Sequence, residues 1–131
     1  LREMSMELPV PGILESPFGF FESKIFSYKK QKIEEKKYTK WFDYDKIKNS
    51  PCVRTRRQGD YLTVNSEGGR KKLNRIFIDE KIPAEMRDRL PVVAVGSEIL
   101  WIPGGRMNEK YKITSTTGRV LELHYQGGAL A

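Results

Sequence analysis

The residues best suited to chemistry in this sequence are Lys and Arg side chains that recur in short sets. A guanidinium is a planar fork of N–H donors that matches phosphate oxygens, and a lysine ammonium is a mobile point charge. Both suit a partner that carries phosphate, either a nucleic acid or a phosphate-rich surface. The candidate binding residues form a first set of Arg54, Arg56 and Arg57, a second set of Arg70, Lys71, Lys72 and Arg75, and a third set of Arg106, Lys110 and Lys112, and Lys81 is a further candidate.

Residue types that perform catalysis are few, and their spacing favours structural roles. Asp43, Asp45 and Asp60 have no defined separation that would make them an acid–base pair. His124 fits a solvent-facing position on a strand, and Cys52 fits a small buried apolar residue. We therefore predict no catalytic residue, no metal site and no cofactor site in this chain.

Composition narrows the class of protein. The chain has 131 residues, of which 38% are hydrophobic and 31% charged, and its formal net charge is +7. These values argue against disorder and against membrane insertion. A single cysteine excludes an internal disulfide, and with one histidine it excludes a Cys/His zinc site built by this chain alone, so a cytoplasmic protein is expected. Because the chain begins at Leu1, we expect a piece of a longer protein.

The apolar pattern predicts an α+β fold: one compact domain with a mostly antiparallel sheet and two short helices. Residues 29–40, with six Lys and two Glu, are expected to form a solvated loop. Five to seven strands are expected, with candidates at residues 7–12, 20–28, 52–57, 61–64, 92–95, 99–102 and 120–125. Residues 92–95 and 99–102 are continuously apolar, and residues 120–125 alternate, with Leu121, Leu123 and Tyr125 on one face.

The clearest helix is predicted at residues 71–81, where Leu73, Ile76 and Phe77 share one side. Basic residues at its start would lie beside free backbone N–H groups and the positive end of the helix dipole, a favourable place for phosphate. A second short helix is expected near Pro83.

The strand at residues 52–57 places Arg54 and Arg56 on one face, because side chains repeat every second residue. Residues 61–64 are expected to form its return strand after a turn. Tyr111 is expected to pack within a later strand rather than to stack on a base.

An ordered set of motifs resembles the C-terminal domain of bacterial tRNA(Ile)-lysidine synthase. The resemblance covers residues 42 to 125 and extends weakly to residues 9–12. Each motif is weak alone, but the set in this order is specific. The motifs are Phe42-Asp43-Tyr44-Asp45-Lys46-Ile47, Arg54-Thr55-Arg56-Arg57-Gln58-Gly59-Asp60, Lys71-Lys72-Leu73, Phe77-Ile78-Asp79-Glu80-Lys81-Ile82-Pro83, Arg87 to Pro91, Leu100-Trp101-Ile102, Gly105-Arg106 and Tyr111-Lys112-Ile113-Thr114.

The resemblance implies an ATP-dependent ligase that joins lysine to the wobble cytidine of tRNA(Ile). In that family an N-terminal catalytic domain carries a nucleotide loop of the form S-G-G-x-D-S, which is absent here. The chain alone should therefore be inactive, with ATP and Mg implied for the missing catalytic domain and no cofactor in this chain. The expected partners are the acceptor stem of tRNA(Ile) and the protein's own catalytic domain, with no membrane, and a homodimer is left open.

The same resemblance implies a fold similar to a module of the phenylalanyl-tRNA synthetase β subunit. It makes residues 1–131 one C-terminal tRNA-binding domain, with a motif-bearing core at 42–126 and with N-terminal strands and the lysine-rich loop at 1–41. One departure is Tyr61, which stands where the family often carries a basic residue.

A competing hypothesis is a protein-interaction or structural domain that clamps the catalytic domain or a second subunit. Binding through phosphate contacts weakens as the salt concentration rises, whereas binding through apolar burial barely changes. The salt dependence of the affinity therefore distinguishes the two hypotheses.

Overall fold

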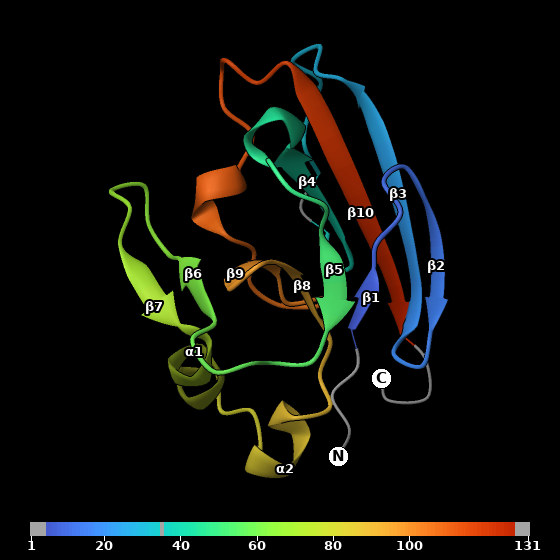
Figure 1. Cartoon of the computed structure of the whole chain (residues 1–131). Helices are drawn as coiled ribbons and strands as arrows, with labels where there is room; N and C mark the ends of the chain where they lie inside the picture. Colours follow the sequence, from blue (N-terminus) through green and yellow to red (C-terminus); the bar gives the residue numbers. More distant parts are fainter. Residues whose placement is uncertain (1–4, 35, 128–131) are drawn as a thin grey trace. The chain divides into compact units, whose positions relative to one another are not determined.

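The computed structural model describes residues 5–34 and 36–127, and the chain divides into two compact units (Figure 1). Unit 1 comprises residues 5–7 and Pro51–Lys110, and unit 2 comprises Leu8–Ser50 and residues 111–127. Each unit has its own β-sheet. The described residues include no helix long and apolar enough to cross a membrane.

Unit 1 is built on a six-stranded sheet in the order β1-β5-β8-β9-β6-β7. All neighbouring strands run antiparallel except β6 and β9, which are parallel. The strand β7 therefore lies at an edge of the sheet. The elements are β1 (Ser5–Glu7), β5 (Cys52–Arg54), β6 (Tyr61–Thr63), β7 (Arg70–Lys72), α1 (Leu73–Asp79), α2 (Ala84–Arg87), β8 (Val92–Val95) and β9 (Glu98–Trp101).

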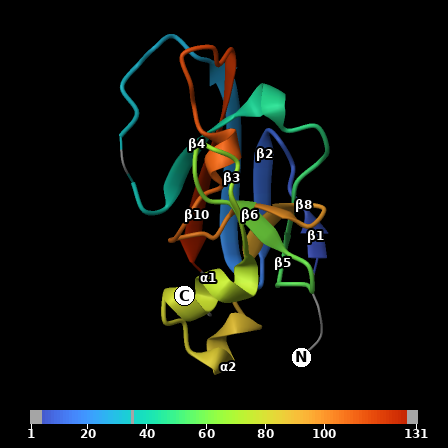
Figure 2. The same ribbon diagram turned by 90° about the vertical axis from the view of Figure 1, so that its left-hand side faces the viewer.

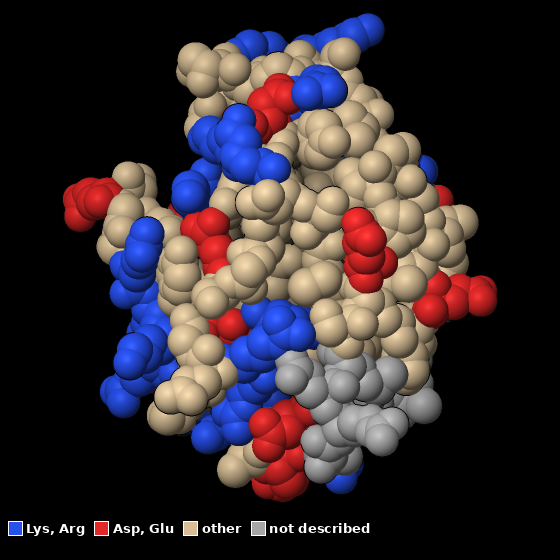
Figure 3. All heavy atoms as spheres, viewed as in Figure 1, with Lys and Arg blue, Asp and Glu red and all other residues tan. Residues whose placement is uncertain are grey.

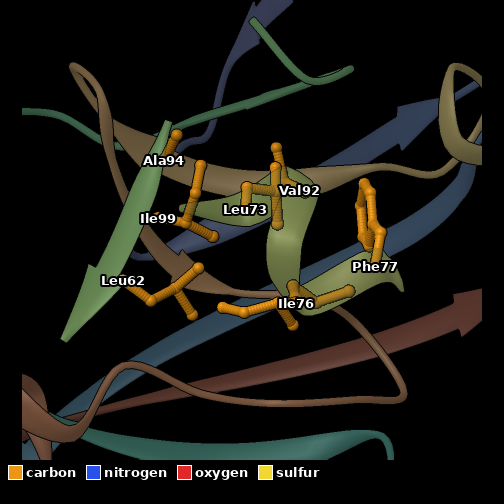
Figure 4. Close-up of a cluster of buried hydrophobic side chains, with 8 residues drawn as sticks. Leu62, Leu73, Ile76, Phe77, Val92, Ala94 and Ile99 are labelled. Atoms are coloured by element: carbon orange, nitrogen blue, oxygen red, sulfur yellow. The ribbon is translucent and has the colours of Figure 1, made fainter. Parts of the chain in front are cut away.

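The core of unit 1 forms where α1 packs against this sheet. Leu73, Ile76 and Phe77 lie at helical spacing on one side of α1 and are each 1% exposed. Figure 4 shows these side chains gathered with apolar side chains of the strands β6, β8 and β9. Because this packing buries three large side chains of a seven-residue helix, tertiary contacts rather than helix propensity stabilise α1.

Unit 2 holds a four-stranded antiparallel sheet in the order β2-β3-β10-β4. Along β10, Leu121, Leu123 and Tyr125 are buried, whereas Glu122 and His124 are partly exposed, which confirms the predicted alternation. The elements are β2 (Gly12–Ser16), β3 (Gly19–Ser27), β4 (Thr39–Asp43), the 3₁₀-helix η1 (Tyr44–Lys46) and β10 (Arg119–Gly127), and a second 3₁₀-helix, η2 (Glu109–Tyr111), spans the change from unit 1 to unit 2.

The fold class is confirmed, as mostly antiparallel sheets with two short helices, but the helix predicted at residues 71–81 is wrong at its start. Arg70–Lys72 form β7, and α1 begins only at Leu73. The reason is pairing: β7 bonds to β6, and Lys72 keeps an extended backbone with φ −66° and ψ 141°. A local apolar period cannot reveal a partner strand elsewhere in the chain.

Two strand predictions also need correction. The strand β6 pairs with β7 and β9 rather than returning along β5, and β5 itself ends at Arg54. Tyr111 lies in η2 and not in a strand. The described residues form ten strands instead of five to seven, since several are three-residue strands too short to show an apolar period.

Candidate nucleic-acid interface

The strand β7 exposes basic side chains at the edge of the unit 1 sheet. Arg70 and Lys72 are exposed and Lys71 is half-buried, as the alternation of a strand requires. The Arg70 guanidinium lies over the ring of Tyr61 on β6, 4.6 Å from its centroid. The tyrosine that departs from the family pattern therefore holds an arginine in place by a cation–π contact.

Arg56 joins the segment between β5 and β6 to the two helices. Its Nε donates to Asp88 Oδ1 at 2.8 Å, just after α2, and its Nη1 donates to Asn74 Oδ1 on α1 at 2.9 Å. Asn74 precedes the exposed Arg75 on α1, and Arg57, beside Arg56, is also exposed. These bonds bring the first two predicted basic sets onto one surface, although they are separated in the sequence.

Arg54 does not belong to that surface, which corrects the prediction that it shares an exposed face with Arg56. Its side chain is 1% exposed and is bidentate to Asp60, with Nη1–Oδ2 2.9 Å and Nη2–Oδ1 2.8 Å. Nη2 also donates to the Gly96 carbonyl at 2.8 Å. The β5 alternation turns Arg54 inward, where it cannot contact a phosphate of a bound partner.

Asp60 is the residue of this site that the sequence does not single out, because an aspartate directly after a glycine is typical of an ordinary turn. Gly59 has φ +92°, which favours glycine, so the turn is real. Beyond the turn, Asp60 Oδ2 accepts the Arg57 N–H at 2.7 Å, and the Asp60 carbonyl accepts the Leu73 N–H at 2.9 Å. Asp60 therefore fixes both the segment that carries Arg57 and the start of α1.

The second predicted basic set is partly neutralised by one carboxylate. Asp79, at the end of α1, bonds to Lys71 and lies 3.3 Å from Arg75 Nε. The hydrogen bond from Lys71, together with the nearby positive charges, lowers the pKa of Asp79 against a smaller opposing effect of desolvation. Asp79 therefore stays ionised at neutral pH and holds the two basic side chains across α1 and β7.

We expect the Asp79 carboxyl to titrate below an unperturbed aspartate in an NMR pH titration. Lys71→Met should raise its midpoint toward the ordinary value, whereas Lys72→Met, on the opposite face of β7, should leave it unchanged. A carboxylate with a lowered folded-state pKa contributes stability above its unfolded pKa, and this contribution disappears as the pH falls through the folded pKa. Equal midpoints in the two variants would contradict this arrangement.

The third basic set is divided by the fold. Arg106 and Lys110 belong to unit 1, where Arg106 Nη2 lies 3.4 Å from the Val64 carbonyl and Lys110 Nζ lies 3.5 Å from Glu98. Lys112 is exposed in unit 2. Lys81 is exposed just after α1. The expected phosphate site at a helix start is wrong, since α1 begins after the basic residues and its Leu73 N–H is already bonded.

Six Lys and Arg side chains, four exposed and two half-buried, form a positive surface over β7, α1 and the segment between β5 and β6 (Figure 3). We call this set the unit 1 basic surface. It contains residues from three segments held by the Arg56 and Asp60 bonds described above. Its members are Arg56, Arg57, Arg70, Lys71, Lys72 and Arg75.

The residues considered for catalysis have structural partners. Asp43 is buried and accepts a hydrogen bond from Thr117 Oγ1 at 2.9 Å. His124 Nδ1 lies 2.8 Å from Thr39 Oγ1, and Cys52 packs against the unit 1 core. Within residues 5–34 and 36–127, no group of three or more His, Cys, Asp or Glu could hold a metal ion.

A family model described as "TilS substrate C-terminal domain" matches residues 52–123, more than half of the chain. The chain belongs to this family. A crystal structure described as a TilS C-terminal domain superimposes on it with a TM-score of 0.80 at 33% identity, covering 96% of this chain and 98% of that one.

Curated relatives of the TilS C-terminal domain carry the name tRNA(Ile)-lysidine synthase. The protein of Caldanaerobacter subterraneus subsp. tengcongensis is 41% identical over 90% of this chain and 26% of its own length. Those of Clostridium tetani and Geobacillus kaustophilus are 41% and 37% identical over 69% and 92% of the chain. The chain spans between 19% and 26% of the length of these three proteins.

Proposed function

We propose that this chain is the tRNA-binding part of a tRNA(Ile)-lysidine synthase and binds the acceptor stem of tRNA(Ile) through the unit 1 basic surface. The observation that carries the proposal is this surface, on a domain whose relatives are named for that ligase. Joining lysine to the wobble cytidine, with its ATP and Mg, is assigned to the part of the ligase beyond this chain, and the working compartment is the cytoplasm.

The chemistry of duplex RNA explains why such a surface suits an acceptor stem. A-form RNA hides most base edges in a deep, narrow major groove, so proteins bind it through phosphates, 2′-hydroxyls and shape. That mode of binding needs cations held on rigid elements. Arg70 is held over Tyr61, Arg56 is bonded to Asn74 and Asp88, and the Arg57 backbone is held by Asp60.

The bonds of Arg56 and Lys71 to carboxylates are compatible with this role. In the Arg56–Asp88 pair the arginine side chain is 25% exposed and the aspartate 60%, so solvent screens the pair and a phosphate can compete for the cation. The same holds for Lys71 and Asp79, whose side chains are about one-third exposed. In the absence of RNA, the carboxylates of Asp88 and Asp79 keep the side chains of Arg56 and Lys71 ordered, which lowers the entropy cost of RNA binding.

Charge reversal tests the proposal directly. Lys72→Glu/Arg75→Glu should weaken binding of the 131-residue chain to transcribed tRNA(Ile) on the order of 100-fold and reduce the salt slope of log affinity by about 2. Lys24→Glu/Lys40→Glu, on strands of unit 2, makes the same change in net charge and should alter affinity less than about threefold. A minimal acceptor-stem hairpin should show the same ranking.

The competing class, a clamp for protein surfaces, makes the opposite prediction. Binding built on apolar burial would persist at high salt and would not distinguish the two variants. Equal affinities for tRNA(Ile) in the two charge-reversed proteins would overturn the assignment of the unit 1 basic surface.

A further inference from the structure

Unit 2 carries more than half of the net charge of +7, although the proposed function does not use it. It holds 11 of the 24 Lys and Arg residues but only 7 of the 17 Asp and Glu residues. Nine of its basic residues lie in three segments, at residues 28–38, 44–50 and 112–119, which include η1 and the first residue of β10, and all nine are exposed. They are Lys29, Lys30, Lys32, Lys36, Lys37, Lys46, Lys48, Lys112 and Arg119.

Residues 28–30, 44–50 and 112–119 meet at the end of the unit 2 sheet where β3 and β4 end and β10 begins, and residues 31–38 lead from there back to the start of β4 (Figure 2). The Tyr28 N–H donates to the Gly118 carbonyl at 2.8 Å, and Lys30 Nζ donates to the Ser115 carbonyl. Arg119 is bonded to Asp45 through Nε at 3.0 Å and Nη2 at 2.6 Å. We call the nine exposed basic residues of these segments the unit 2 basic end, of which Lys36 and Lys37 lie toward the start of β4.

Charge at this end is poorly balanced. Ion pairs there include Lys36 with Glu34, Lys46 with Asp43, and Arg119 with Asp45. The same segments and the adjoining end of β4 contain only one further carboxylate, Glu35, so nine basic residues are set against four acidic ones. Gathering like charges costs free energy through repulsion, which a polyanionic partner would relieve.

The composition of the unit 2 basic end favours RNA over another protein. Cores of protein–protein interfaces are depleted in lysine and enriched in large aromatic residues, whereas eight of these nine residues are lysines. Lysines on connecting segments are mobile point charges, and such charges suit the regular phosphate backbone rather than base edges. Among the described residues of these segments, the exposed large apolar side chains are Ile33 and Tyr38.

We propose that the unit 2 basic end is a second RNA-binding surface, which contacts backbone phosphates of the tRNA held by the unit 1 basic surface. This inference rests on the proposed function and adds a contact outside unit 1. It also gives a role to five lysines between β3 and β4, Lys29, Lys30, Lys32, Lys36 and Lys37, in a segment that the sequence indicated only as a solvated loop.

The test is Lys30→Glu/Lys48→Glu in the 131-residue chain, measured against tRNA(Ile) at several salt concentrations. We expect affinity to fall roughly tenfold and the salt slope to decrease by between about 1 and 2. The matched control is again Lys24→Glu/Lys40→Glu, which changes the charge of the same unit equally but on its strands. The control should change affinity less than about threefold, and thermal unfolding should verify that both variants stay folded.

The outcomes separate this inference from the proposed function. If the unit 1 variant loses affinity while Lys30→Glu/Lys48→Glu matches the control, the second surface is overturned and the proposed function stands. If only the unit 2 variant loses affinity, the unit 1 site fails and the unit 2 surface stands. If Lys30→Glu/Lys48→Glu keeps the wild-type affinity for tRNA but loses affinity for an acidic protein, the unit 2 basic end is a protein-binding surface and the inference is overturned. If the wild-type chain does not bind tRNA, both the inference and the proposed function are overturned.

Discussion

Replacing Asp60 with alanine is expected to lower the free energy of unfolding by about 3–5 kcal/mol, because it leaves the Arg54 guanidinium buried without its counter-charge. Both side chains are almost completely buried, with 1% and 2% exposed. The substitution also leaves the Arg57 N–H without its acceptor. Urea denaturation monitored by tryptophan fluorescence measures the loss.

A charge-balanced variant separates the buried pair from its surroundings. Arg54→Met/Asp60→Leu removes both charges at similar volume and should recover more than half of the loss, since no uncompensated ion remains. As a surface control, Asp45→Ala breaks the exposed pair with Arg119 and should leave stability almost unchanged. Equal losses in the single and double variants would show that the carboxylate matters only for packing.

The pair also connects stability to the unit 1 basic surface. In the double variant no carboxylate holds the Arg57 N–H, so the segment between β5 and β6 becomes less ordered even if the fold survives. We therefore expect faster hydrogen exchange at the Arg57 amide in the folded double variant than in the wild-type chain. The buried Arg54–Asp60 pair thereby positions Arg57, which contacts RNA in the proposed function.

Phe77→Ala should destabilise the chain by about 3–5 kcal/mol, through the lost transfer free energy of the ring and the cavity that remains. Phe77 is 1% exposed in the core between α1 and the unit 1 sheet. Because α1 is seven residues long and has no side-chain cap, it depends on this packing. Chemical denaturation gives the size of the effect.

Ile78 supplies a control on the same helix. It follows Phe77 directly but is 48% exposed, so Ile78→Ala should change stability by no more than about 0.5 kcal/mol. A similar loss in both variants would contradict the assignment of the buried face of α1. The same measurement in the presence of tRNA(Ile) should show greater stability for every variant that retains binding.

Local patterns in the sequence predicted the features that depend on neighbouring residues. Alternation identified β10 with its buried Leu121, Leu123 and Tyr125, and continuous apolar runs identified β8 and β9. Helical spacing identified the buried side of α1 correctly, through Leu73, Ile76 and Phe77. Short-range periodicity is sufficient for such elements because burial of one face imposes it directly.

Residue type and order alone determined that the chain is basic, that its fold is α+β and that it resembles the family to which it belongs. Only the tertiary structure decided which basic residues are available to a partner. Arg54 and Arg56 are two residues apart and were predicted to act together, yet one is buried against Asp60 and the other reaches Asn74 and Asp88. The physical reason is that a charge can be buried only beside a counter-charge, and long-range strand pairing places that counter-charge.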